Sequence, residues 1–177
     1  MSDESTPPQL PATAPYLFGD LLALARQSWI GQMEQRLDAL GYTGYQRSDA
    51  TTMRLLLRHS PVPVGRAAPA LGVTRQAARK IIDNLERRGF VRTERDALDT
   101  RRVNVVLTAA GTAYAHAVVG VIHALNRELC ERVEPELLAA ADAVLRASIT
   151  DEGVAARAAR VGRPPGVAGA PGAPGHG

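Results

Sequence analysis

The 177-residue sequence predicts a mainly α-helical fold with one small β-hairpin. Although 45% of its residues are hydrophobic, only 4% are aromatic, so the core must come from Leu, Val, Ile and Ala. This composition favours packed helices over a β-sandwich. Apolar residues also recur at spacings of three and four along most of the chain, and this period changes only after Gly89. A chain of this length buries one good core and is short for two independent domains.

Both ends of the chain differ in composition from the middle. Segment 1–15 is rich in Pro, Ser and Thr, and the last sixteen residues contain six glycines and four prolines. We therefore expect 1–15 and 158–177 to be disordered and 16–157 to form a single domain. The single cysteine, the absence of a basic N-terminal segment and the absence of a long apolar run predict a cytoplasmic protein without membrane contact.

Two helices are predicted in the first third of the chain. The first runs from about residue 19 to 40 and ends at Gly41. The second runs from about Ser48 to residue 59, with the Ser48 hydroxyl as its N-terminal cap, and Pro61 stops it. The first helix carries a continuous apolar face, formed by Leu21, Leu22, Ala25, Trp29, Met33, Leu37 and Leu40.

A short helix, a turn and a long helix follow. Residues 64–71 predict the short helix, which Pro69 should kink or delay, because proline removes a hydrogen bond and clashes one turn back. Gly72 supplies the turn. Thr74 then caps a long helix that extends to Arg88 and closes at Gly89.

Beyond Gly89, residues 90–95 and 101–107 predict two strands of a hairpin with a turn-rich tip. Thr108 caps a helix that runs to about residue 133, and Pro135 suits the first position of a final helix. The order of short helix, turn, long helix and hairpin describes a winged helix-turn-helix. The predicted fold is therefore a winged helix-turn-helix lobe between N- and C-terminal helical regions.

Basic residues gather in this central region. From Arg66 to Arg102 there are ten basic and five acidic residues, a net charge of +5, whereas the rest of the chain carries −2. Such a block in a nearly neutral protein indicates a polyanionic partner.

The long helix divides into a buried stripe and a polar face. Arginine and glutamine can read base edges in the major groove, lysine pairs with phosphates, and the helix start can hold a phosphate oxygen. A solvated helix face is the alternative interpretation. The candidate DNA-binding residues of this helix are Thr74, Arg75, Gln76, Arg79 and Lys80.

The predicted hairpin tip carries Asp99, Thr100 and Arg101. An arginine projected from a narrow hairpin can enter the minor groove, and a carboxylate two residues earlier can hold its guanidinium in a fixed geometry. A purely structural Asp–Arg pair in a turn is the alternative. Further arginines flank the tip, namely Arg92, Arg95 and Arg102.

Residues 71–91 resemble the recognition-helix segment of the MarR family, and residues 99–101 and 105–111 resemble its wing and the exit from the wing. The weaker similarity extends over about 18–149. The resemblance implies a homodimer in which helices at about 18–40 and 109–157 of two subunits interlock, with a DNA-binding lobe at about 48–107. It also implies that residues 74–80 read the major groove and that Arg101, oriented by Asp99, reads the minor groove.

Members of this family often lose DNA affinity when small aromatic or acidic molecules bind between the dimer and DNA lobes. The candidate effector pocket, assigned by chain position, consists of Trp29, Tyr42, Tyr45, Arg47 and His59, although each is more often a packing or surface residue. We therefore expect a sequence-specific regulator on a palindromic promoter site, acting as a repressor that an effector releases.

Two other functions stay open, namely a winged-helix module for protein contact and a non-specific architectural DNA-binding protein. No Gly-rich phosphate loop, nucleophile elbow or zinc-peptidase motif is present, so we expect neither an enzyme nor a cofactor. The histidines at 59, 116 and 123 lack the spacing of metal ligands. Acidic neighbours favour a structural role for Cys130 over a redox role.

Overall fold

The computed structural model describes residues 17–150. The predicted ends, 1–15 and 158–177, lie outside these residues. The described elements are α1 (Phe18–Ala39), α2 (Arg47–His59), β1 (Val62–Pro63), α3 (Val64–Leu71), α4 (Arg75–Arg87), β2 (Val91–Arg95), β3 (Val103–Leu107), α5 (Ala109–Arg132) and α6 (Pro135–Ala147). The predicted fold, mainly helical with a small β wing, is confirmed. Within the described residues no helix is long and apolar enough to cross a membrane.

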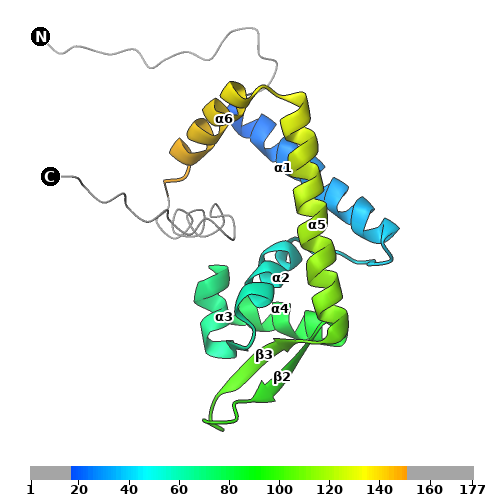
Figure 1. Ribbon diagram of the computed structural model, residues 1–177. Coiled ribbons are helices and arrows are strands. Elements are labelled where there is room, and N and C mark those ends of the chain that lie inside the picture. The colour runs from blue at the N-terminus through cyan, green and yellow to red at the C-terminus, as the bar shows by residue number, and fades with distance from the viewer. Residues whose placement is uncertain (1–16, 151–177) are drawn as a thin grey trace, which may run out of the picture.

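The long helix α5 connects two regions of the molecule (Figure 1). At one end it lies beside α1 and α6, and at the other it leads into the sheet and the group of α2, α3 and α4. The ion pair between Arg36 and Glu128, 2.6 Å from Nη1 to Oε1, joins α1 to α5. The helix-turn-helix and its wing therefore project from one end of α5.

The wing is a three-stranded antiparallel sheet in the order β1-β3-β2. In the hairpin, Val91 pairs with Leu107 and Arg95 with Val103. Strand β1 was not predicted, because Pro61 before it and Pro63 within it signal only the end of a helix. Its pairing of Val62 with Val105 adds a third strand to the predicted two and ties the start of α3 to the wing.

Two predicted caps are confirmed and one is wrong. The hydroxyls of Thr74 and Thr108 accept the backbone N–H groups of Ala77 and Gly111. At the start of α2, the Asp49 carboxylate takes the place expected for Ser48 and accepts the N–H of Gln46 at 3.1 Å.

Helix α3 runs through Pro69 without a break. The ring removes only the hydrogen bond to Gly65 in the first turn. Ala67, Ala68 and Leu71 are buried on the opposite side, and their burial stabilises the helix against this loss. The expected late start at Pro69 is therefore not observed, because α3 already begins at Val64.

The core lies where α1, α2, α4, α5 and the sheet meet, and Met33, Met53, Leu85 and Val118 are nearly inaccessible there. The predicted apolar face of α1 is buried only in part, because Leu21 and Leu22 remain exposed. None of the residues in α6 is buried. The larger apolar side chains that remain exposed in α1, in α6 and at the residue before α1 are Leu17, Phe18, Leu21, Leu22, Leu24, Leu137, Val144 and Leu145.

Candidate nucleic-acid interface

Helix α4 shows the two faces that its sequence predicts. Ala78, Ile82 and Leu85 are buried against the core at spacings of four and three. The predicted DNA-binding residues Arg75, Gln76, Arg79 and Lys80 are all exposed. Thr74 serves as the N-terminal cap, its Oγ1 lying 3.1 Å from the nitrogen of Ala77.

A buried polar cluster fixes the C-terminal end of α4. Asp49 is only 1% exposed, and its Oδ2 accepts hydrogen bonds from Arg88 Nη1 and Tyr114 Oη, each at 2.7 Å. The guanidinium of Arg88 also lies 4.8 Å from the ring centre of Phe90, which stacks on Tyr114 at 4.2 Å. Burial, and next the hydrogen bond to Asp49, raise the pKa of the Tyr114 phenol.

This cluster joins α2, the end of α4 and α5, so it sets the angle at which α4 leaves the core. Its residues were not among those predicted from the sequence. One signal was present, since Asp49, Met53 and Leu56 follow the spacing of a buried helix face. An acid on such a face requires a cationic or hydrogen-bonding partner.

A close backbone contact fixes the wing against α5. A Cβ atom added to Gly111 would lie 1.7 Å from the carbonyl oxygen of Phe90, which only a residue without a side chain avoids. The backbone N–H of Thr108 donates to the same carbonyl at 3.1 Å, and the Thr108 hydroxyl donates to the carbonyl of Gly89 at 2.7 Å. The start of β2 and the start of α5 are thus held together.

The wing tip is ordered by two aspartates. Asp96 accepts hydrogen bonds from Asn104 Nδ2 at 2.9 Å and from the backbone of Leu98 and Asp99. The bond from Asn104, followed by the backbone bonds, holds the pKa of the Asp96 carboxyl below its usual range.

The expected side-chain pair between Asp99 and Arg101 is wrong. The Oδ2 of Asp99 lies 3.0 Å from Nε of Arg102, whereas Arg101 contributes only its backbone N–H to Asp99 Oδ1 at 3.1 Å. Because the turn needs that backbone bond, the carboxylate faces the main chain of Arg101 and meets the next side chain. The guanidinium of Arg101 therefore extends from the tip without a carboxylate partner among residues 17–150.

Four arginines from three elements line one groove of about 540 Å³. Arg66 comes from α3, Arg79 from α4, and Arg101 and Arg102 from the wing. Arg79 also pairs with Asp83 at 3.0 Å, but this pair is exposed and therefore weak. The groove thus presents concentrated positive charge between the polar face of α4 and the wing. We name it the arginine groove.

The remaining predicted residues lie around this groove. Arg75 and Gln76 are exposed in the first turn of α4, and Arg95 is exposed at the end of β2. Lys80 lines a separate hollow with Gln46 and Arg87. Arg66 was not singled out from the sequence, because only the folded chain brings the start of α3 beside the wing.

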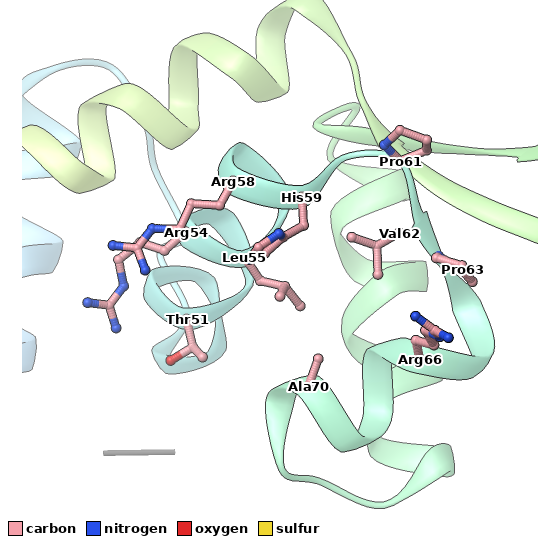
Figure 2. Close-up of a pocket in the computed structure, with 10 residues that line it drawn as sticks. All are labelled: Thr51, Arg54, Leu55, Arg58, His59, Pro61, Val62, Pro63, Arg66 and Ala70. Carbon is pink, nitrogen blue, oxygen red and sulfur yellow. The ribbon is translucent and has the colours of Figure 1, made fainter. Parts of the chain in front are cut away.

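The five residues of the predicted effector pocket differ in their surroundings. Tyr42 packs on the Tyr114 ring with ring centres 5.1 Å apart, and Trp29 and Tyr45 are half-buried against the core. Arg47 is exposed at the first position of α2. Of the five, only His59 lines the pocket between α2 and α3 that Figure 2 shows.

Cys130 and the arrangement of possible metal ligands concern the redox and metal chemistry considered from the sequence. Cys130 is a free, exposed thiol near the end of α5. It is therefore not part of the core, whereas the structural role expected from the sequence would place it there. No cluster of three or more His, Cys, Asp or Glu side chains within residues 17–150 is arranged to hold a metal ion.

A sequence model of the MarR family matches residues 43–102, which include α2, the helix-turn-helix, strands β1 and β2 and the wing tip. Over this segment the chain is similar to the MarR family. No curated protein sequence matches the chain.

Solved structures extend the likeness beyond the MarR-family segment. A MepR–DNA complex from S. aureus is 22% identical, with a TM-score of 0.63 over 73% of this chain and 94% of that chain. A probable transcriptional regulator from Pseudomonas aeruginosa is 18% identical, with a TM-score of 0.60 over 73% and 94%. YusO from Bacillus subtilis is 19% identical, with a TM-score of 0.54 over 75% and 93%. The chain therefore shares their fold, including the helices outside the matched segment.

Proposed function

We propose that this chain is a sequence-specific DNA-binding transcription regulator rather than an enzyme. The observation that carries the proposal is the arginine groove beside the exposed polar face of α4, on a MarR-family winged helix. A groove of this charge fits the phosphate backbone of duplex DNA, and an exposed α-helix fits its major groove. The likeness to MepR, which has been solved with DNA, supports the same function.

Each part of the interface has a distinct role in this proposal. Arg75, Gln76 and Arg79 read base edges, because their donors and acceptors match guanine and adenine in the major groove. Lys80 holds a phosphate. Arg101 enters the minor groove, since its guanidinium has no carboxylate partner in the described chain. Arg66, Arg95 and Arg102 contact the backbone beside these sites.

The proposed regulator acts as a homodimer. Leu21, Leu22 and Leu24 in α1 and Leu137 and Val144 in α6 expose apolar surface that the rest of residues 17–150 does not cover. A second copy covers this surface with the same residues, as a two-fold interface requires. A two-fold dimer also matches a palindromic site, where it represses transcription by blocking polymerase until a small aromatic or acidic effector releases it.

DNA titrations test this proposal. Fluorescence anisotropy is measured with a labelled duplex from upstream of the gene, beside a scrambled duplex, at two salt concentrations. We expect a preference of roughly a thousandfold for the upstream duplex and an affinity that falls steeply with salt. Arg101→Ala should weaken binding, whereas Arg26→Ala, an exposed arginine in α1, should leave it unchanged.

Each competing function predicts a different result. Equal affinity for both duplexes indicates an architectural DNA-binding protein, for which Arg79→Ala and Arg101→Ala reduce binding to any sequence alike. No binding to either duplex at low salt refutes the proposal and favours a winged-helix module for protein contact.

A further inference from the structure

A second pocket lies on the helix-turn-helix, away from the aromatic residues in which an effector site was predicted. It has a volume of about 450 Å³, is lined by residues of α2, β1 and α3, and is open to solvent on one side. This volume falls within the range of sites for small molecules. Figure 2 shows that its middle is apolar, with Leu55 from α2 and Ala70 from α3 facing the space between the two helices.

The ionisable groups of this pocket are all basic, and its arginines lie at two sides, while Thr51 adds a hydroxyl. Arg54 and Arg58, one helical turn apart on α2, extend to one side, and Arg66 of α3 lies at the other (Figure 2). His59 adds an imidazole. No Asp or Glu lines the pocket.

These guanidinium groups lack counterions in the described chain. Six arginines within residues 17–150 form ion pairs with carboxylates, but Arg54, Arg58 and Arg66 form none. Arg54 donates only to the backbone carbonyl of Ala50, at 3.1 Å. Burial, and next the positive charge of Arg58, lower the pKa of Arg54. A partly buried cation beside a second cation is stabilised by an incoming anion.

We propose that this pocket binds a small organic dicarboxylate, with one acid group at Arg54 and Arg58, an apolar body over Leu55 and the second acid group at Arg66. Arginine suits both ends, because its planar guanidinium pairs with a carboxylate through two parallel hydrogen bonds. The apolar middle selects against simple inorganic anions, because these cannot cover Leu55 and Ala70.

Arg66 connects this pocket to DNA binding, and this step rests on the proposed function. Arg66 and Pro63 line both the dicarboxylate pocket and the arginine groove. One guanidinium cannot hold a ligand carboxylate and a DNA phosphate in the two places at once. Occupation of the pocket therefore weakens DNA binding, and DNA weakens ligand binding by the same factor.

Calorimetric titrations of the full-length protein test the pocket. The probes are naphthalene-2,6-dicarboxylate, 2-naphthoate and the neutral 2-naphthamide, which share one apolar body and differ in charge. We expect affinity to fall about tenfold or more for each acid group removed, which corresponds to about 1.4 kcal/mol per factor of ten. Equal affinity for all three probes would overturn the assignment, because it would mean that only apolar surface is recognised.

Variants locate the two ends of the ligand. Arg66→Gln should bind the dicarboxylate about as weakly as 2-naphthoate, and Arg54→Gln combined with Arg58→Gln should have the same effect. Ala70→Leu should reduce binding by filling the pocket without changing its charge, whereas Arg26→Gln should have no effect. Unchanged dicarboxylate binding in both the Arg66 variant and the Arg54/Arg58 variant places the ligand elsewhere and refutes the proposal.

The coupling to DNA is measured by anisotropy with and without saturating dicarboxylate. We expect the ligand to weaken binding to the upstream duplex in the unsubstituted protein and to have no effect in Arg66→Gln. If the duplex binds but the ligand does not change its affinity, the coupling through Arg66 is wrong. If the ligand binds with the expected charge dependence but no duplex binds, the pocket is supported and the proposed function is overturned.

Discussion

The buried carboxylate of Asp49 offers the sharpest test of how the recognition helix is held. In Asp49→Ala, the donors of Arg88, Tyr114 and Gln46 lose their common acceptor. Breaking a buried ion pair by removing one partner costs about 3–5 kcal/mol, because the other charge stays buried. The Arg88 side chain is 19% exposed, so water solvates part of it and the expected loss lies at the lower end, about 3 kcal/mol.

Urea unfolding followed by circular dichroism, at one protein concentration, measures this loss. With a denaturant dependence of about 2 kcal/mol per molar urea, 3 kcal/mol lowers the midpoint by about 1.5 M. Asp83→Ala removes an exposed partner of Arg79 and should change stability by less than about 0.5 kcal/mol. The double variant Asp49→Leu/Arg88→Met should recover most of the loss, since it leaves no buried charge unpaired. A midpoint for Asp49→Ala within about 0.3 M of the unsubstituted protein would falsify this reasoning.

Three further predictions concern the same chain. Gly111→Ala should destabilise the fold by about 1–3 kcal/mol, because the added methyl group overlaps the Phe90 carbonyl. Gly120→Ala in the same helix meets no atom and should stabilise the fold by about 0.5–1 kcal/mol, and thermal melts compare the two variants. The raised pKa of Tyr114 favours its protonated form in the folded state. Its contribution to stability is therefore complete below the ordinary phenol value of 10.0 and is lost as the pH rises above it, so urea midpoints measured from pH 9 upward should fall less steeply in Tyr114→Phe. Val144→Glu combined with Leu145→Glu should reduce the dimer to a monomer in light scattering, whereas Arg101→Ala should stay dimeric. An unchanged mass of the Val144/Leu145 variant would mean that α6 is not at the interface.

Features of the fold that depend on neighbouring residues were predictable from the sequence. Thr74 and Thr108 cap helices because a side-chain oxygen reaches an N–H group three residues ahead, which needs no knowledge of the rest of the chain. Gly89 closes α4 with a positive φ of 76°, a conformation that glycine adopts at little cost. The buried stripe of α4 follows from its period alone.

Features that depend on distant residues were not predictable in the same way. Asp49 and Arg88 meet across 39 positions. The same carboxylate also accepts the N–H of Gln46 at the start of α2, where the Ser48 cap was expected. Strand β1 is too short to show a period, and it exists because β3 offers it a free edge. At the wing tip, spacing could not decide whether Asp99 pairs with Arg101 or Arg102, since the direction of the turn decides it.

The two ends of α4 serve different purposes: the polar cluster around Asp49 stabilises its C-terminal end, and the arginine groove lies along its exposed face. Arg88, just beyond the last helical residue, is anchored to Asp49, while Arg79 lies on the exposed face without contributing to the core. A helix held at one end in this way keeps its exposed N-terminal half in a fixed direction without using the residues that we propose to read DNA. Substitution of Arg79 should therefore reduce DNA affinity at unchanged stability, whereas substitution of Asp49 should reduce stability first. If Arg79→Ala instead lowered the urea midpoint as much as Asp49→Ala, recognition and stability would share the same residues, and the arginine groove would be part of the folding core rather than a surface built for a partner.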